Sequence, residues 1–342
     1  MTTQIEDRAA VVQAPPVLVT EARVRRTERI SPHFVRVVLE SPDFVDLAAH
    51  EGFDTRFKLV LPGPGGMLPP IPDPVDGYYQ GLLAMPDEHR AAMRTYTIRE
   101  VREEDGQVLL VVDLVVHQPP EAAGPACRWA IAARPGDVVQ VIAPHRRSIA
   151  AGTPYGGSEF DPGTRRRLLL VGDETALPAI TRILLDLARG HVGTVFLEVP
   201  GSADVLDVPV PPGMEIVWLP RGREPYGAPL VEAVRRHLGL APRTDAGTDT
   251  GTDTDGPDLP EQPATLDIDV WETPRYSAAG EDLAVQRARR TVGTDLEDLY
   301  AWIAGESWMV KVLRRALVRE VGVDRDQVAF MGYWREGVAM RS

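Results

Sequence analysis

The chain has 342 residues, a length that favours two domains over a single hydrophobic core. Its 44% hydrophobic and 25% charged residues are typical of a globular protein. Acidic residues outnumber basic ones by 50 to 37, a formal net charge of −13 that argues against a nucleic-acid-binding protein, because such proteins carry a basic face.

Targeting signals and cysteine usage favour the cytoplasm. The sequence contains no run of about 18 consecutive apolar residues, so we expect no membrane span. The first residues (MTTQIEDRAA) are too polar for a secretory signal. The single Cys127 excludes an intramolecular disulfide and suits a reducing compartment. We expect a cytoplasmic protein, and a monomer.

The first half of the sequence predicts a series of short strands. Residues 1–16 are predicted to be a disordered leader, and residues 17–146 alternate apolar and polar runs between Pro, Gly and Asp turns. This spacing predicts an antiparallel β-barrel or sandwich. We expect strands at 17–30, 33–40, 56–61, 94–101, 107–116 and 137–143. The proline-rich residues 62–93 form a long loop, either a functional lid or a solvated insertion.

The segment RTYTIR, residues 94–99, carries the most informative chemistry. Neighbouring side chains of a strand point to opposite faces, so Arg94 and Tyr96 share one face and Thr97 lies on the other. A guanidinium can clamp a pyrophosphate, a phenol ring can stack, and a threonine hydroxyl can bond to a ring nitrogen. The segment therefore suits the middle of a flavin. An ordinary edge strand with exposed arginines is the alternative.

From residue 165 to residue 338 the pattern changes to apolar strands alternating with amphipathic helices. This alternation predicts βαβ units around a parallel sheet with right-handed crossovers. We expect strands at 167–173, 192–199, 214–220, 299–305 and 327–334, and helices at 176–190, 229–239 and 306–322. Thr, Asp, Gly and Pro dominate residues 241–263, which predicts a disordered loop inside this domain.

Two strand-to-helix turns lie where open α/β sheets bind dinucleotides. The first, GDETALP, begins at Gly172 and is not the G-x-G-x-x-G fingerprint, and its two carboxylates would repel a pyrophosphate lying on it. Capping of the helix by Asp173 or Thr175 is an equally good explanation. The second turn contains Gly305 and Glu306, where the helix dipole alone would favour the acid.

Several other chemistries find no support. One cysteine excludes iron–sulfur clusters and thiolate zinc sites. The seven histidines form no metal-binding motif, and neither a nucleophile elbow nor a P-loop occurs. We therefore expect no metal site in the protein.

Taken in order, these segments resemble a known family. A barrel with R-x-Y-T followed by a parallel α/β domain is the plan of the ferredoxin-reductase-type flavoproteins. Among these the chain closely resembles the siderophore-interacting proteins, the NAD(P)H-dependent ferric-siderophore reductases. The resemblance spans about residues 17–337 and rests on RTYTIR, RFKLVLP, VVH before GPACRWA and RPGD, LLVGDETALPAI, AWIAGE and GYWREG.

The resemblance implies an FAD bound on the barrel. Arg94 would hold the FAD pyrophosphate, and Tyr96 would pack along the flavin. Thr97 would hydrogen-bond near the reactive N5 as a catalytic residue. Arg99 would add charge to the phosphates.

GPACRWA would begin a short helix whose backbone N–H groups receive a phosphate, at Gly124, Pro125, Ala126 and Cys127. Cys127 stands where the family is expected to have Ser or Thr, so one hydroxyl donor is missing. His117 falls at a family histidine that contacts flavin. The link that follows, QPPEAA, is longer than usual, and a strand-end histidine satisfied by backbone is the alternative.

The resemblance also implies a nicotinamide site on the second domain. Asp173 and Thr175 would line the bound nucleotide, with Thr175 on the nicotinamide side. Gly305 and Glu306 would face the nicotinamide or the flavin edge, with Glu306 as a second catalytic candidate. Arg221 follows the strand predicted over 214–220, where a basic residue would select NADPH over NADH by binding the 2′-phosphate of the adenosine.

The implied reaction takes a hydride from NADPH or NADH and passes electrons to the Fe(III) of a ferric siderophore, which is released as Fe(II). Ferric siderophores are often anionic, so Lys58, Arg128 and Arg335 are the predicted substrate-binding residues. A flavin reductase serving another acceptor would show the same sequence features. A non-enzymatic siderophore carrier with a degenerate flavin fold is a further alternative.

Overall fold

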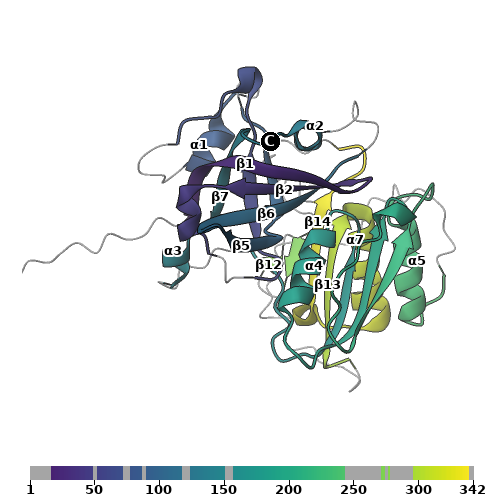
Figure 1. The fold of residues 1–342 in the computed structure, drawn as a ribbon. Coiled ribbons are helices and arrows are strands. Elements are labelled where there is room, and N and C mark those ends of the chain that lie inside the picture. The colour runs from purple at the N-terminus through teal and green to yellow at the C-terminus, as the bar shows by residue number, and fades with distance from the viewer. Residues whose placement is uncertain are drawn as a thin grey trace, which may run out of the picture.

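The computed structural model describes residues 17–48, 52–71, 78–86, 90–117, 124–150, 157–242, 271–273, 276–277 and 296–338. Within these residues two seven-stranded sheets lie next to each other (Figure 1). The predicted leader lies outside the described residues, and so does the predicted disordered loop from residue 243 onward.

The first sheet is antiparallel and forms a half-barrel, as predicted. Its strand order is β4-β3-β7-β1-β2-β6-β5, and each neighbouring pair is antiparallel. The strands are β1 (Val17–Ser31), β2 (Phe34–Glu40), β3 (Arg56–Val60), β4 (Met93–Thr97), β5 (Glu100–Glu104), β6 (Gln107–Val115) and β7 (Val138–Pro144). Alternate side chains such as Val37, Leu59 and Leu110 are buried in one apolar core, which drives the sheet to curve around them.

The predicted strand 94–101 is divided into β4 and β5. The Ile98 N–H donates to the Thr55 carbonyl oxygen at 2.8 Å, beside β3, whereas the Arg99 N–H donates to the Val111 oxygen of β6 at 3.0 Å. The chain therefore changes partners between these two residues. As a result the RTYTIR segment crosses from one edge strand of the half-barrel to the other.

The long segment 62–93 was predicted to be a loop throughout, which is wrong for its middle. Helix α1 (Tyr78–Ala84) forms there, because Tyr78 and Leu82 lie one turn apart and pack with Val60 and Ile142 on the outer face of the sheet. The other helices of this half are α2 (Pro125–Ala132), α3 (Arg146–Ala150) and the 3₁₀ turns η1 (Pro42–Asp46) and η2 (Pro64–Gly66).

The second sheet contains the five predicted parallel strands. Its order is β10-β9-β8-β13-β14-β11-β12; the first five strands are parallel and β11 joins them antiparallel. The strands are β8 (Arg167–Gly172), β9 (Val192–Val199), β10 (Met214–Pro220), β11 (Trp271–Thr273), β12 (Tyr276–Ser277), β13 (Leu299–Glu306) and β14 (Val328–Trp334). The order reverses between β8 and β13, where open α/β sheets bind ligands.

Helices cover both faces of this sheet. Helix α4 packs on the face that carries Leu168 and Leu170, while α5 and α7 pack on the face that carries Leu169 and Val171. The helices and turns are α4 (Leu177–Asp186), α5 (Ala228–His237), α7 (Ser307–Arg315), the π-helical turn η5 (Ala316–Val321), and the 3₁₀ turns η4 (Ser202–Asp204) and η6 (Arg325–Gln327). The helix predicted over 306–322 is thus α-helical only to residue 315, and the one predicted to reach Gly190 ends at Asp186.

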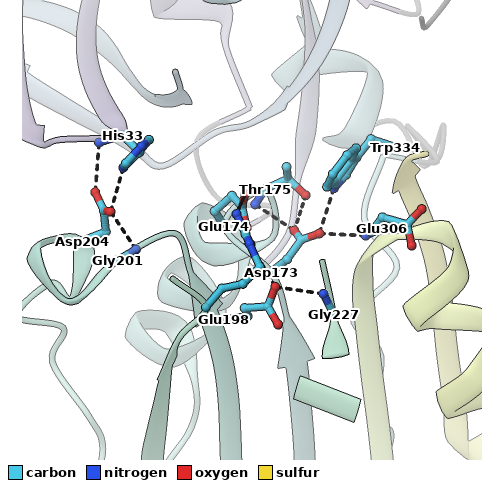
Figure 2. Close-up of polar contacts among 11 residues, drawn as sticks. His33, Asp173, Glu174, Thr175, Glu198, Gly201, Asp204, Gly227, Glu306 and Trp334 are labelled. Carbon is cyan, nitrogen blue, oxygen red and sulfur yellow. Dashed lines mark hydrogen bonds and ion pairs between the residues drawn. The ribbon is translucent and has the colours of Figure 1, made fainter. Parts of the chain in front are cut away.

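Buried carboxylates join the two halves of the molecule. Asp54, before β3, is fully buried and accepts a hydrogen bond from the Trp302 indole N–H of β13 at 3.1 Å. Asp204 accepts from the Ser31 hydroxyl at 2.7 Å. The same carboxylate pairs with the His33 ring at 2.8 Å, as Figure 2 shows. Phe34 lies in the apolar core of the second half. The two sheets are therefore held in one fixed arrangement, with the carboxyl ends of the parallel strands next to the half-barrel (Figure 1).

Candidate functional site

Strand β4 places its two flavin candidates on the inner face of the half-barrel. Arg94 pairs in register with Leu59, and Tyr96 pairs with Phe57, and both partners are fully buried in the core. Burial raises the pKa of the Tyr96 phenol above its usual range and lowers the pKa of the Arg94 guanidinium. A partly buried guanidinium gains from a bound anion, because an anion offsets the cost of its desolvation. Arg94 and Tyr96 therefore suit the roles predicted for them.

Thr97 is the last residue of β4 and is buried on the opposite face from Tyr96. Its partner in register is Arg56, whose guanidinium forms an ion pair with Glu159 at 2.8 Å. The Thr97 side chain therefore lies on the other face of the strand from the Arg94 and Tyr96 side chains.

Arg99 already lies next to a carboxylate. Its Nε is 3.6 Å from Oδ2 of the buried Asp113, which also accepts two hydrogen bonds from Arg36, at 2.7 and 2.8 Å. Burial is the main cause that lowers the pKa of Arg99, followed by attraction to Asp113, which opposes that shift. One carboxylate shared by two guanidiniums leaves a net positive charge, so a phosphate would compete with Asp113 for Arg99.

Helix α2 begins without a capping side chain. Gly124 is its N-cap in an extended conformation and Pro125 follows, and a glycine has no side chain with which to cap the first backbone N–H groups. Groups of this kind bind anions, which supports the predicted phosphate position. The first turn of α2 therefore offers the backbone N–H groups of Ala126 and Cys127 to an anion, and their contact with a phosphate stays a prediction.

The Cys127 side chain has a different task. The His117 backbone N–H donates to its sulfur at 3.2 Å, and the thiol donates to the His117 carbonyl at 3.9 Å. The thiol therefore ties the start of α2 to the chain just after β6. Burial raises its pKa, so it remains a thiol at neutral pH. The residue is directed at His117 rather than at a phosphate.

An open groove of about 770 Å³ lies beside α2 and is lined also by residues of β1, β7 and the turn η2. Apolar groups supply much of its wall, and the thioether of Met67 is 73% exposed there. Glu21 and Asp137 give it an acidic side. The lining residues are Glu21, Pro62, Gly66, Met67, Leu68, Trp129, Gly136, Asp137 and Val138. Such a groove suits a flat aromatic group better than a phosphate.

Asp173 joins three parallel strands at their carboxyl ends (Figure 2). Its Oδ1 accepts from the backbone N–H and the hydroxyl of Thr175 at 2.9 and 2.6 Å. Its Oδ2 accepts from the Glu306 N–H at 2.7 Å and the Trp334 indole N–H at 2.8 Å. Burial raises the pKa of this carboxyl to about 6. The side chain fixes the ends of β8, β13 and β14 relative to one another.

Neither Asp173 nor Thr175 caps α4, contrary to the alternative interpretation of the sequence. The N-cap is Ala176, with no side-chain hydrogen bond. Thr175 donates its hydroxyl proton to Asp173, so the hydroxyl reaches a nicotinamide only as an acceptor. Both residues form the floor of the strand-to-helix turn.

Gly305 permits this packing. Its φ is +142°, and a Cβ at this position would lie 2.6 Å from the Asp173 carboxyl group. Glu306 caps α7 instead of standing free: its Oε2 accepts from the backbone N–H groups of Trp308 and Met309 at 2.6 and 3.2 Å. These contacts are those of a helix cap and give no support to the predicted catalytic role of Glu306.

Arg221 is unavailable to a ligand, which overturns the role suggested for it from the sequence. Its guanidinium donates to both oxygens of Glu174, at 3.0 and 3.1 Å, and to Glu198 Oε1 at 2.9 Å. It is only 8% exposed and lies 4.1 Å from the centre of the Tyr226 ring. A 2′-phosphate would have to displace two buried carboxylates from it.

Trp334 is the site residue that the sequence reasoning missed, although its segment GYWREG was noted. Its ring meets Tyr226 edge-on, with centroids 4.9 Å apart, and lies 6.3 Å from the His117 ring of the half-barrel. Burial lowers the pKa of His117, which favours its neutral form. An aromatic residue at the carboxyl end of a parallel strand was the signal available in the sequence.

The three predicted substrate-binding cations come from three different elements. On β3, the Lys58 ammonium donates to the Thr95 hydroxyl at 2.7 Å, and burial, followed by repulsion from Arg56, lowers its pKa. Arg128 is exposed on α2, and Arg335 is exposed directly after β14.

Comparison with known proteins follows the division seen in the fold. Residues 23–148 match the profile of the siderophore-interacting FAD-binding domain, and residues 165–337 match that of the siderophore-interacting protein. The chain belongs to the siderophore-interacting protein family. Among the helices of the described segments, none combines the length and apolar character needed to cross a bilayer. No group of three potential metal ligands occurs in the same residues.

Individual relatives agree with this family. An uncharacterised protein of Mycobacterium tuberculosis is 30% identical over 217 residues, covering 61% of this chain and 70% of the relative. The ferric vibriobactin reductase ViuB of Vibrio cholerae is 24% identical, covering 91% of this chain and 88% of its own. The crystal structure of the siderophore-interacting protein SipS from Aeromonas hydrophila is similar at a TM-score of 0.61 and 26% identity, covering 95% and 94% of the two chains.

Proposed function

We propose that the chain is an FAD-dependent NAD(P)H ferric-siderophore reductase that releases iron by reducing Fe(III) to Fe(II). The single observation that carries the proposal is the RTYTIR strand end beside the uncapped start of α2, in a domain of the siderophore-interacting FAD-binding type. Membership of the family and similarity to a ferric vibriobactin reductase support the substrate class.

The residues present fit an FAD. Arg94 and the backbone N–H groups of Ala126 and Cys127 would hold its pyrophosphate, because a cation and a helix start both favour an anion. Tyr96 would pack along the flavin, and Thr97 would hydrogen-bond near its N5. The groove beside Trp129 has room for the adenine. When bound, the FAD supplies hydride acceptance and single-electron transfer, neither of which amino-acid side chains provide.

The carboxyl edge of the parallel sheet would receive the nicotinamide cofactor. Gly172 and Gly305 keep this edge free of side chains, since a Cβ on either would strike neighbouring atoms at 2.5 and 2.6 Å. Asp173 holds the floor in place and orients the Trp334 ring toward His117. The protein's part is therefore to orient the two reactants and exclude water between them.

Lys58, Arg128 and Arg335 are the proposed contacts of the ferric siderophore. These cations would attract an anionic chelate to a protein whose overall charge is −13. Iron would enter as the Fe(III) of the siderophore and leave as Fe(II), as substrate and product of the reaction.

Ferrous iron release tests this function. Purified protein, freed of unbound FAD by gel filtration, is mixed without oxygen with NADH or NADPH, a ferric catecholate and a chromogenic Fe(II) chelator. We expect Fe(II) to form in proportion to the protein and to require its bound FAD. Reduction of the flavin without Fe(II) would favour another acceptor, and failure to retain any FAD would favour a non-enzymatic carrier.

A further inference from the structure

The end of the parallel sheet next to β9 and β10 carries a buried ion cluster of Glu174, Arg221 and Glu198. One guanidinium neutralises one of the two carboxylates, so the cluster keeps a net negative charge. All three side chains are at least 90% buried. Charges in such surroundings are weakly screened and act over longer distances than surface charges do.

Part of this negative charge has no partner. Glu198 Oε1 accepts from Arg221 and from the Gly227 backbone N–H, both at 2.9 Å. Its Oε2 is buried and, among the described residues, accepts no hydrogen bond. Burial is the main cause that raises the pKa of Glu198, whereas the hydrogen bonds from the Gly227 N–H and from Arg221 oppose this shift and favour the ionised form. Native proteins rarely leave a buried carboxylate oxygen unsatisfied, so this atom calls for an explanation.

The position of the cluster in the sheet suggests an explanation for the unsatisfied Glu198 oxygen. A dinucleotide on an open α/β sheet extends from the first strand toward the end of the next, and an acid there favours NADH whereas an arginine accommodates the 2′-phosphate of NADPH. Here the first strand is β8 and the next is β9, in which Glu198 is the penultimate residue. The arginine at this end, Arg221, is bound to both glutamates.

We propose that the Glu174–Arg221–Glu198 cluster makes this protein select NADH over NADPH, by opposing a 2′-phosphate at the adenosine end of the site. The inference rests on the proposed function and names its reductant. A 2′-phosphate adds close to two negative charges beside a cluster that is already negative. Arg221 is held back from it, because turning outward would leave Glu174 and Glu198 buried without a counter-charge.

A second arginine, Arg223, lies two residues after Arg221 and is exposed in the turn after β10. A contact between an exposed arginine and a phosphate is screened by solvent and contributes less to binding than a buried one. Arg223 is therefore not expected to reverse the preference set by the buried cluster.

Binding of two inert probes to the FAD-loaded protein tests the proposal. Titration calorimetry compares 5′-ADP with 2′,5′-ADP, which differ only in the phosphate at issue. We expect 5′-ADP to bind at least about tenfold more tightly, given the like-charge repulsion in a poorly screened site. The substitution Glu198→Gln keeps the side chain's shape and an acceptor oxygen but removes one charge. The ratio of the 2′,5′-ADP dissociation constant to the 5′-ADP dissociation constant should therefore fall about fivefold in this variant.

Two further variants complete the design. Glu174→Gln removes the other charge and should likewise lower the ratio of the 2′,5′-ADP dissociation constant to the 5′-ADP dissociation constant. Glu232→Gln, an exposed site on α5, should leave it unchanged, and a melting curve for each variant checks that it is folded. Equal or tighter binding of 2′,5′-ADP by the wild type, or an unchanged ratio in both cluster variants, would overturn the proposal. If neither NADH nor NADPH reduces the flavin, the proposed function itself is refuted, whatever the ratio of probe affinities.

Discussion

Single residues decide how closely the carboxyl edge of the parallel sheet is packed. Gly305 has a backbone conformation that favours glycine, and it lies against the carboxyl group that holds three strands together. On the half-barrel the residue that we expect to matter most is Arg94, a partly buried cation in the strand proposed to face the FAD. Each can be tested by a substitution with a matched control.

Replacing Gly305 with alanine should destabilise the fold by about 2–4 kcal/mol, because both backbone strain and a clash with Asp173 oppose it. Urea unfolding followed by circular dichroism measures the loss. Gly239 also has a positive φ, of +70°, but a Cβ there meets nothing within 4 Å. Gly239→Ala should therefore cost only about 1 kcal/mol, the contribution of strain alone. Equal losses at the two sites would show that Asp173 moves aside freely.

Replacing Arg94 with alanine should weaken FAD binding about 10- to 100-fold, the loss expected for a charge-assisted contact with phosphate. The dissociation constant is measured by the quenching of FAD fluorescence as apoprotein is added. Arg102→Ala removes a charge from β5 of the same sheet and serves as the control. Similar losses in the two variants would mean that only overall charge matters, and that Arg94 does not contact the pyrophosphate.

At the scale of elements, the ends of β8, β13 and β14 depend on one carboxyl group. Four donors surround Asp173, which stabilises its ionised form, whereas complete burial opposes ionisation and dominates the raised pKa of about 6. The native state therefore holds a proton that the unfolded chain has already lost between about pH 4 and pH 6. The stability contributed by this group is present at low pH and is lost as the pH rises through about 6.

The difference in unfolding free energy between wild type and Asp173→Asn reports this group alone. It should decrease by up to about 3 kcal/mol between about pH 4 and pH 7, because the asparagine does not titrate. Chemical unfolding at several pH values measures it. A difference that does not change with pH, or that grows as the pH rises, would show that the four hydrogen bonds outweigh burial.

At the scale of the whole molecule, buried acids and a shared core hold the two sheets as one unit. Asp54 alone accepts from the Ser158 hydroxyl, the backbone N–H groups of Glu159 and Phe160, and the Trp302 indole. This matters for electron transfer, because the proposed flavin site lies on one sheet and the proposed nicotinamide site on the other.

Asp54→Ala should lower stability by about 3–5 kcal/mol, since it leaves several buried donors without an acceptor. It should also slow reduction of the flavin by NADH more than it weakens FAD binding, because the two sites lose their fixed spacing. Scanning calorimetry and stopped-flow absorbance measure the two effects. Asp207→Ala, an exposed acid of the second half, is the control. Wild-type reduction rates in Asp54→Ala would contradict the role given to this interface.

The sequence predicted the elements better than the contacts between them. Strand and helix periodicity are local, so the antiparallel sheet and the parallel sheet followed from it, although the single strand predicted over 94–101 is divided into β4 and β5. The partners of Arg221 come from two distant strand ends, and the His117–Cys127 bond joins residues on either side of a connection. Nothing local encodes such pairings, which depend on how strands far apart in the sequence are packed. The cap that Glu306 forms on α7 is by contrast local, because it bonds to the N–H groups two and three residues further on, and the sequence already offered a helix start as the alternative to a catalytic role.

The most direct test of the reductase proposal is the absorbance spectrum of the FAD-loaded protein without oxygen, recorded alone, after NADH, and then after a ferric siderophore. We expect flavin bands that bleach with NADH and return when the ferric chelate is added. Flavin bands that do not bleach with NADH or NADPH, or that bleach and stay bleached with every ferric chelate, would contradict the account.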